Sequence, residues 1–147
     1  MKLSTRTRYG TRALLDLARH EDNRPVQLKD IASRQNISLP YLEHIITPLV
    51  GAGIVRSTRG ARGGLQLSRH PNELKLSEVV QLLEGTNMPV DCINNPESCT
   101  RSGFCVTRDV WSEIKTAIDK TLNSITLQDL VDREKKKEAS AKALGIA

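Results

Sequence analysis

Three cysteines fall within fourteen residues in the second half of the chain, in the pattern Cys92-x6-Cys99-x5-Cys105. Thiolates are soft ligands that suit iron–sulfur clusters and zinc, and accessible thiols can also act as redox switches without metal. Structural zinc sites usually contain CxxC pairs, which this spacing lacks. The pattern favours an iron–sulfur cluster over a metal-free thiol switch, and both over zinc, but spacing alone leaves all three open.

A cluster normally has four protein ligands, whereas this chain contains only three cysteines. The fourth ligand is therefore expected to be an oxygen or nitrogen atom from this chain, a partner or an external molecule. A cluster with mixed ligands is expected to be sensitive to oxidants, which suits a sensor. Structural disulfides are not expected, because we place the chain in the cytoplasm.

A second group of chemically suited residues lies in ISLPYLEHI, at residues 37–45. Ser38 and Tyr41 carry hydroxyl groups that can bind phosphate, and His44 can bind a base or a phosphate. Glu43 can accept a hydrogen bond from a cytosine amino group but is repelled elsewhere, so it is expected to discriminate between sequences. The expected DNA contacts from this segment and the helix before it are Leu28, Ser38, Pro40, Tyr41, Glu43 and His44.

A glycine-rich tip carrying two arginines lies between two short expected strands, residues 54–58 and 65–68. Arg59 and Arg62 can enter the negative potential of a DNA minor groove, and Gly60 lets the backbone approach closely. The segment is therefore expected to be a β-hairpin wing that contacts DNA.

The elements that must position these groups begin with two amphipathic helices, over residues 4–20 and 28–35. Asn36 suits the left-handed turn after a helix, and Ser38 is a good cap for the next one. Two helices joined by a tight turn and followed by a hairpin are typical of a winged helix-turn-helix. Pro48 lies inside the third helix and is expected to kink or shorten its last turns.

The second half is expected to begin with a helix capped by Ser77 and ending at Glu84. Residues 86–105 form a long loop that contains all three cysteines, and a loop of this length is usually functional. A helix follows over about 106–122, with an apolar face too wide for a free surface helix. A short helix capped by Thr126 is expected to precede a frayed tail.

The fold class is thus mainly α, with a winged helix-turn-helix domain, a β-hairpin wing and a long dimerisation helix. The expected units are the DNA-binding domain 1–75, the short helix and cysteine-bearing loop 76–105, the dimerisation helix with its short follower 106–132, and a charged flexible tail 133–147.

Charge and composition favour double-stranded DNA as the partner. Residues 1–75 carry 13 Lys/Arg against 6 Asp/Glu, whereas residues 76–147 carry 9 against 11. A basic front half fits a nucleic-acid-binding module, and the few aromatic residues disfavour single-strand binding by base stacking. No apolar run suggests a membrane span or a secretory signal, so cytoplasmic residence and no membrane partner are expected.

Several motifs together resemble the IscR/NsrR family of winged-helix iron–sulfur regulators. They are the MKLSTRTRYG start, ISLPYLEHI, TRGARGG and the cysteine loop leading into CVTRDVW, and the likeness spans roughly residues 1–132. The resemblance implies a homodimer joined by a long helix, here about 106–122, with the cysteine loop beside the partner's first helix. It also implies Cys92, Cys99 and Cys105 as cluster ligands, Glu43 as specificity residue, and Arg59 with Gly60 at the wing tip.

Two positions depart from the family pattern. The iron–sulfur-assembly regulators have a histidine where this chain has Arg108, and the nitric-oxide sensors have an aspartate where it has Arg8. A guanidinium stays protonated and cannot bind iron, so neither known fourth ligand is present. Asp91, Glu97, Asp109 or a side chain from the partner's first helices could take that place.

The sequence therefore predicts a homodimeric regulator that binds a palindromic operator and is not an enzyme. Similarity to the assembly regulators favours a 2Fe–2S cluster and control, as a repressor, of cluster-assembly genes. The alternatives are a nitric-oxide-sensing repressor with a 4Fe–4S cluster and a metal-free thiol switch. An electron-transfer enzyme is disfavoured, because no substrate or cofactor motif occurs.

Overall fold

The computed structural model describes residues 2–20, 22, 24–85 and 90–146. The chain is mainly α-helical, with one two-stranded antiparallel hairpin, which confirms the expected fold class. Residues 86–89, the start of the expected cysteine loop, lie outside the described residues. In the part of the chain that the structure describes, no helix combines the length and apolar character needed to cross a membrane.

The helix-turn-helix consists of α1 (Thr5–Arg19), α2 (Leu28–Gln35) and α3 (Leu39–Gly51). Ser4 caps α1, and its side chain accepts a hydrogen bond from the Thr7 amide. Asn36 adopts the left-handed conformation at φ 53°, as expected, and turns the chain from α2 into α3.

Pro48 does not end α3, which continues to Gly51. Proline leaves the carbonyl four residues earlier without a helical donor, and that carbonyl belongs to His44. Because His44 is exposed, solvent can satisfy this acceptor and the last turn can form. The expected shortening of α3 is therefore not observed.

The wing is formed by β1 (Val55–Thr58) and β2 (Gly64–Leu67), with Val55 opposite Leu67 and Thr58 opposite Gly64. The hairpin is joined to the body by a bridge between Val26 and Leu65, whose backbone groups exchange two hydrogen bonds of 2.8 Å. A Cβ on Gly64 would lie 2.6 Å from the Val26 carbonyl oxygen, and φ is 151° there. Only glycine fits this junction without strain.

Helix α4 (Leu76–Glu84) begins one residue before the predicted cap at Ser77, and Lys75 occupies the cap position. The Lys75 amide donates to the Glu78 carboxylate at 3.3 Å, whereas a cap at Ser77 would place Val80, which has no acceptor, three residues later. Three short 3-10 turns follow beyond the undescribed residues: Asp91–Ile93, Pro96–Ser98 and Ser102–Phe104.

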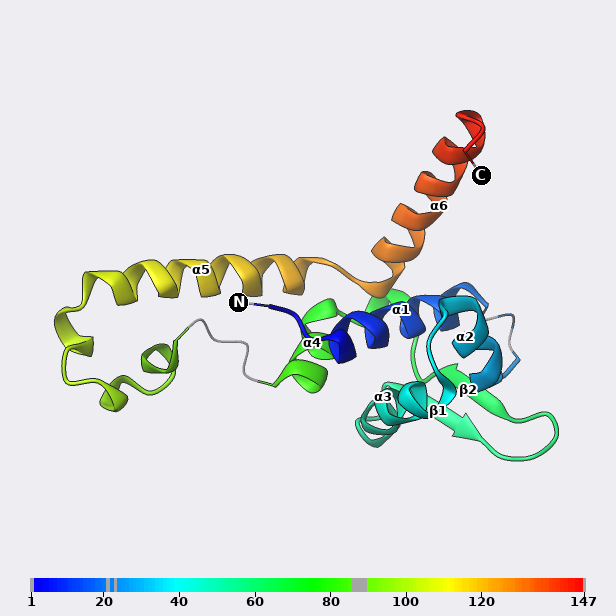
Figure 1. Cartoon of the computed structure of the whole chain (residues 1–147), viewed down its shortest axis with the longest axis horizontal. Coiled ribbons are helices and arrows are strands. Elements are labelled where there is room, and N and C mark those ends of the chain that lie inside the picture. The colour runs from blue at the N-terminus through cyan, green and yellow to red at the C-terminus, as the bar shows by residue number, and fades with distance from the viewer. Residues whose placement is uncertain (1, 21, 23, 86–89, 147) are drawn as a thin grey trace.

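Helix α5 (Val106–Ser124) extends away from the body, and the segment with the three short turns lies at its far end (Figure 1). Helix α6 (Leu127–Ala143) returns to pack on α1. It is much longer than the short helix expected there and includes most of the segment predicted to be a flexible tail. Arg19 of α1 donates to both carboxylate oxygens of Glu138, at 2.7 and 3.0 Å, and Glu134 lies 3.2 Å from the same guanidinium.

The core joins α1, α2, α3, the hairpin, α4 and the start of α6. Its fully buried side chains include Leu14, Ile31, Leu42, Leu49, Val79 and Leu127. Helix α3 lies on one side of this core, and α6 packs on the other side, against α1 (Figure 1). The core therefore holds α3 with one face free.

Candidate DNA-binding surface and cysteine loop

The buried face of α3 determines which of its side chains point outward. Leu42, Ile45, Ile46 and Leu49 are buried in the core. The remaining positions of the first turns are exposed, and these include all five predicted contacts: Ser38, Pro40, Tyr41, Glu43 and His44. The same periodicity that builds the core thus presents the polar residues on one surface.

A groove of about 600 Å³ between α3 and the hairpin brings predicted residues from three elements together. Its lining includes Leu28 from the start of α2, Glu43 from α3 and Gly60 from the wing tip. Leu28 is half-buried there, whereas Arg59, Gly60 and Arg62 are exposed on the tip. The groove makes Glu43 part of a surface shared by helix and wing.

Side-chain contacts hold the wing and the turn of the helix-turn-helix in place. The Gln27 amide donates to the Gly63 carbonyl at 2.9 Å and ties the tip loop of the wing to the start of α2. Arg12 donates to the Gln35 carbonyl at 2.6 Å, and its guanidinium lies 5.4 Å from the centre of the Tyr9 ring. The Tyr9 ring meets Tyr41 of α3 edge-on, with centroids 6.1 Å apart.

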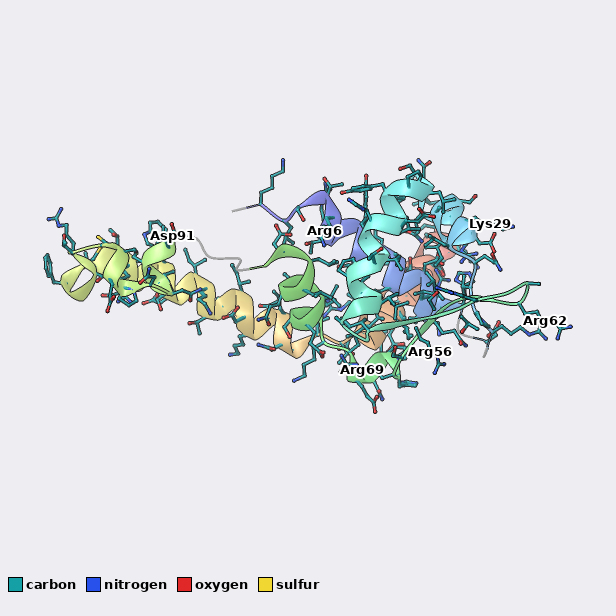
Figure 2. All side chains as sticks on the ribbon, turned by 90° about the horizontal axis from the view of Figure 1, so that it is seen from below. Arg6, Lys29, Arg56, Arg62, Arg69 and Asp91 are labelled. Atoms are coloured by element: carbon teal, nitrogen blue, oxygen red, sulfur yellow. The ribbon has the colours of Figure 1, made fainter. Side chains whose placement is uncertain are left out.

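Basic residues surround α3, and three of them, Arg6, Lys29 and Arg56, were not singled out from the sequence. Figure 2, which looks onto the side where α3 lies, shows Arg6, Lys29, Arg56 and Arg62 distributed around it. Such a distribution suits phosphate contacts on both sides of a major groove. The charge excess of residues 1–75 indicated such a surface, but only the fold shows which cations share it.

Asp16 is buried, with 3% of its side chain exposed, behind the DNA-binding surface. Arg34 donates to both of its carboxylate oxygens, and Gln35 donates to one of them at 2.9 Å. Burial on its own raises the pKa of Asp16, but the hydrogen bonds from Arg34 and Gln35 outweigh it and hold the pKa below its usual value. The charged group therefore joins α1 to the C-terminal end of α2.

The cysteine loop, as described over residues 90–105, has no buried side chain. Cys99 is exposed, Cys92 and Cys105 are half-buried, and all three are free thiols. Their donor type suits an iron–sulfur cluster. Within the described residues, however, no three Cys, His, Asp or Glu side chains lie close enough together to hold a metal ion. The thiols are the type of ligand that an iron–sulfur cluster needs, but the described loop does not bring them close enough together to bind one.

Arg108 fastens this loop to the first turn of α5. Its Nε donates to the Cys92 carbonyl at 2.9 Å, and its Nη1 donates to the Ser102 carbonyl at 3.5 Å. The three candidate carboxylate ligands from this chain, Asp91, Glu97 and Asp109, are all exposed. A side chain that cannot bind iron thus holds the main chain at Cys92 and at the turn that precedes Cys105.

Cys105 occupies the cap position of α5 and has a local partner. Its Sγ lies 3.1 Å from the Thr107 hydroxyl. This hydrogen bond, helped by one from the Arg108 amide, lowers the pKa of the Cys105 thiol below its ordinary value. A thiol with a lowered pKa is more readily deprotonated, as both metal binding and oxidation require.

This arrangement of helices, hairpin and basic surface defines a winged helix-turn-helix transcription regulator. The Rrf2 family model, described as iron-dependent transcriptional regulators, matches residues 3–133. The chain belongs to the Rrf2 family. Its members are named as transcriptional regulators, in agreement with the expectation that the chain is not an enzyme.

Individual relatives are similar over nearly the whole chain. A protein named rrf2 from Nitratidesulfovibrio vulgaris is 47% identical over 131 residues, covering 89% of this chain and 87% of the relative. The solved structure of T. potens IscR superposes with a TM-score of 0.75 at 41% identity, over 91% of this chain and 88% of that one. CymR, titled the global cysteine regulator of B. subtilis, gives 0.77 at 34% identity over 90% and 98%.

Proposed function

We propose that the chain binds double-stranded DNA as a homodimer and that the state of its cysteine loop controls this binding. The observation that carries the proposal is the groove that Glu43 of α3 shares with Gly60 of the wing tip, beside the exposed Ser38, Tyr41 and Arg59 on the same two elements. In this proposal the first turns of α3 enter the major groove and the wing tip enters the adjacent minor groove. Residues 1–75 are the DNA-binding unit, and the regulator acts in the cytoplasm on chromosomal DNA.

The homodimer is proposed to form through α5. None of its nineteen residues is buried in the single chain. The apolar side chains Val106, Val110 and Trp111 are therefore left in contact with solvent, with exposures of 75%, 49% and 37%. A second copy of the helix would remove this apolar surface from water. A two-fold axis between the copies predicts a palindromic operator with half-sites one or two helical turns apart.

The cysteine loop is proposed to hold an iron–sulfur cluster through Cys92, Cys99 and Cys105, with 2Fe–2S favoured and 4Fe–4S as the alternative. The support is the thiolate donor set, the family's iron-dependent description and the similarity to IscR. When bound, such a cluster would supply sensitivity to oxidants or to iron supply. The proposed targets are cluster-assembly genes, which the protein represses. If the cluster is 4Fe–4S, the proposed function is instead that of a nitric-oxide-sensing repressor.

A metal-free thiol switch is a second candidate, and specific observations favour it. The three thiols are free and reachable, and the described loop does not draw them together. The lowered pKa of Cys105 favours its thiolate, which is the form that oxidants attack. CymR, titled a cysteine regulator, shares the fold over 90% of this chain.

Protein purified without oxygen separates these candidates. The cluster proposal predicts coloured protein whose iron-to-sulfide ratio gives the cluster type, and loss of iron when Cys92→Ser, Cys99→Ser or Cys105→Ser is made. Colourless protein that still changes operator affinity on oxidation would support the thiol switch instead.

Sedimentation of Val110→Glu tests the dimer, because a charge on the α5 face should give monomers. Dimers unaffected by this substitution would contradict the α5 interface.

A further inference from the structure

Glu84, the last residue of α4, binds the N-terminus of α1 across a sequence separation of 80 residues. The Ser4 amide donates to both of its carboxylate oxygens at 3.1 Å, and the Ser4 hydroxyl donates to one of them at 2.7 Å. The Thr7 hydroxyl donates to the same oxygen. We refer to Ser4, Thr7 and Glu84 together as the latch.

The latch is held by more than one kind of interaction. Thr7 is only 1% exposed, so its hydroxyl has no access to bulk water and depends on Glu84. A carboxylate at the N-terminus of α1 is also favoured by the helix dipole. The hydrogen bonds from Thr7 and Ser4 lower the pKa of Glu84, because they stabilise its charged form.

Directly before the latch, α4 contacts both α1 and α3 at one point. A Cβ built on Gly10 would overlap Leu83 Cδ1 and would lie 3.2 Å from Ile45 Cγ2. The end of α4 and the middle of α3 are therefore both packed against the backbone of α1 at this glycine. Tightly packed helices move together rather than deforming, so a shift of α4 passes to α3.

Directly after the latch, the chain leaves for the cysteine loop. Gly85 ends α4, and the first cysteine is seven residues further on. The latch thus lies where the chain passes from the loop to the packed helices.

We propose that the latch is the coupling point through which the state of the cysteine loop reaches the recognition helix α3. The proposal rests on the proposed function, in which the loop controls DNA binding. With the latch closed, α4 transmits a rearrangement of the loop through Leu83 and Gly10 to Ile45 of α3. With the latch removed, the packing at Gly10 remains, but the end of α4 is no longer tied to the N-terminus of α1, so less of the rearrangement reaches α3.

The test combines a change in the loop with a change in the latch in the full-length dimer. Hydrogen exchange in residues 39–51 is compared between the oxygen-free protein and a Cys92→Ala/Cys99→Ala/Cys105→Ala variant. The same pair is then measured with Glu84→Ala added, and operator affinity is measured for all four proteins. Substituting the cysteines should change exchange in α3 by about tenfold when Glu84 is present, and much less when it is absent.

Matched variants keep the result interpretable. Thr7→Val removes one donor at nearly constant shape and should lower the coupling partly, whereas Glu84→Gln keeps an acceptor and should retain part of it. Gln81→Ala, on the exposed side of α4, should leave the coupling intact. Equal effects of the cysteine substitutions with and without Glu84, or no effect on α3 in either, would overturn the latch. A coupled change in exchange with no change in operator affinity would instead contradict the proposed function.

Discussion

The DNA-binding body and the cysteine loop are built in opposite ways. Among the described residues, every buried hydrophobic side chain lies between Ala13 and Leu83 or at Leu127 and Val131, and none lies in residues 90–126. The body therefore has a geometry fixed by packing before any ligand arrives. The loop has only short turns, hydrogen bonds and Arg108 to hold it, so a ligand, an oxidant or a partner chain can reshape it at little cost. A rigid DNA-binding body joined to a loop that can change its conformation suits the proposed function, in which the loop controls DNA binding.

The largest expected effect tests whether stability resides in the body. Leu42→Ala removes a fully buried side chain of α3 and should lower the free energy of unfolding by about 2–5 kcal/mol, because a cavity is left. Urea denaturation measures it. Phe104→Ala in the loop, where 72% of the side chain is exposed, should change the same quantity by less than about 0.5 kcal/mol. Similar losses in both variants would mean that the loop contributes to the core.

A smaller effect is expected from the buried charge behind α3. Asp16→Asn should cost about 2 kcal/mol, because Arg34 and Gln35 lose an ionised acceptor. Since the pKa of Asp16 is lowered in the folded state, its stabilising contribution is full above the unfolded pKa of about 4 and is lost as pH falls through the folded pKa. The variant should therefore lose less stability on acidification than the parent chain.

The matched control for Asp16 is Asp119→Asn on α5. Asp119 pairs with Lys115 but is 47% exposed, so its removal should cost no more than about 0.5 kcal/mol. Thermal unfolding between neutral and acidic pH compares the two variants. An equal acid dependence in both would show that Asp16 does not differ from a surface carboxylate.

The next effect sharpens the comparison on the side of DNA recognition. Arg59→Ala or Arg62→Ala should weaken operator binding by about 1–2 kcal/mol. Each lost phosphate contact should also lower the slope of the logarithm of affinity against the logarithm of salt concentration by about one. Fluorescence anisotropy at several salt concentrations measures both quantities. Arg133→Ala, on α6, serves as the charge-matched control and should leave binding unchanged.

Glu43→Ala should relax sequence choice more than it alters affinity, so an unchanged preference among operator variants would argue against its assigned role.

The smallest effect concerns the attachment of the loop. Arg108→Ala removes the hydrogen bonds to the Cys92 and Ser102 carbonyls, so the Cys92 thiol should become more accessible. Alkylation followed by mass spectrometry should detect faster labelling of Cys92, with the melting temperature unchanged because no core residue is involved. Arg101→Ala, an exposed arginine of the same loop, is the control. Slower or equal labelling in Arg108→Ala would show that the arginine does not restrain the loop.

The elements determined by short-range periodicity could be predicted from the sequence. The apolar steps of α1 to α3, the left-handed Asn36 and the strands around the glycine-rich tip all follow from local chemistry. For the same reason the residues expected to face DNA emerge on one surface. Local patterns determine which side of a helix is buried, and the opposite side follows from it.

Contacts between distant segments could not be predicted in this way. Beyond its predicted end, α6 pairs through Glu134 and Glu138 with Arg19, more than a hundred residues earlier. The contact of Glu84 with Ser4 and Thr7 likewise leaves no periodic trace in the sequence. The cysteine spacing shows which atoms are available as ligands, but their positions depend on a loop without a core of its own.

The most direct test of the account is operator affinity in two states of the loop. Oxygen-free protein is titrated onto the promoter of its own gene, and the titration is repeated after the cysteines have been oxidised or stripped of metal. If the loop controls DNA binding, affinity changes by about tenfold or more, and this change disappears in the Cys92→Ser/Cys99→Ser/Cys105→Ser variant although that variant stays folded. Equal affinity in both states of the parent protein, with binding still dependent on Arg59, would show a DNA-binding protein that the cysteine loop does not control.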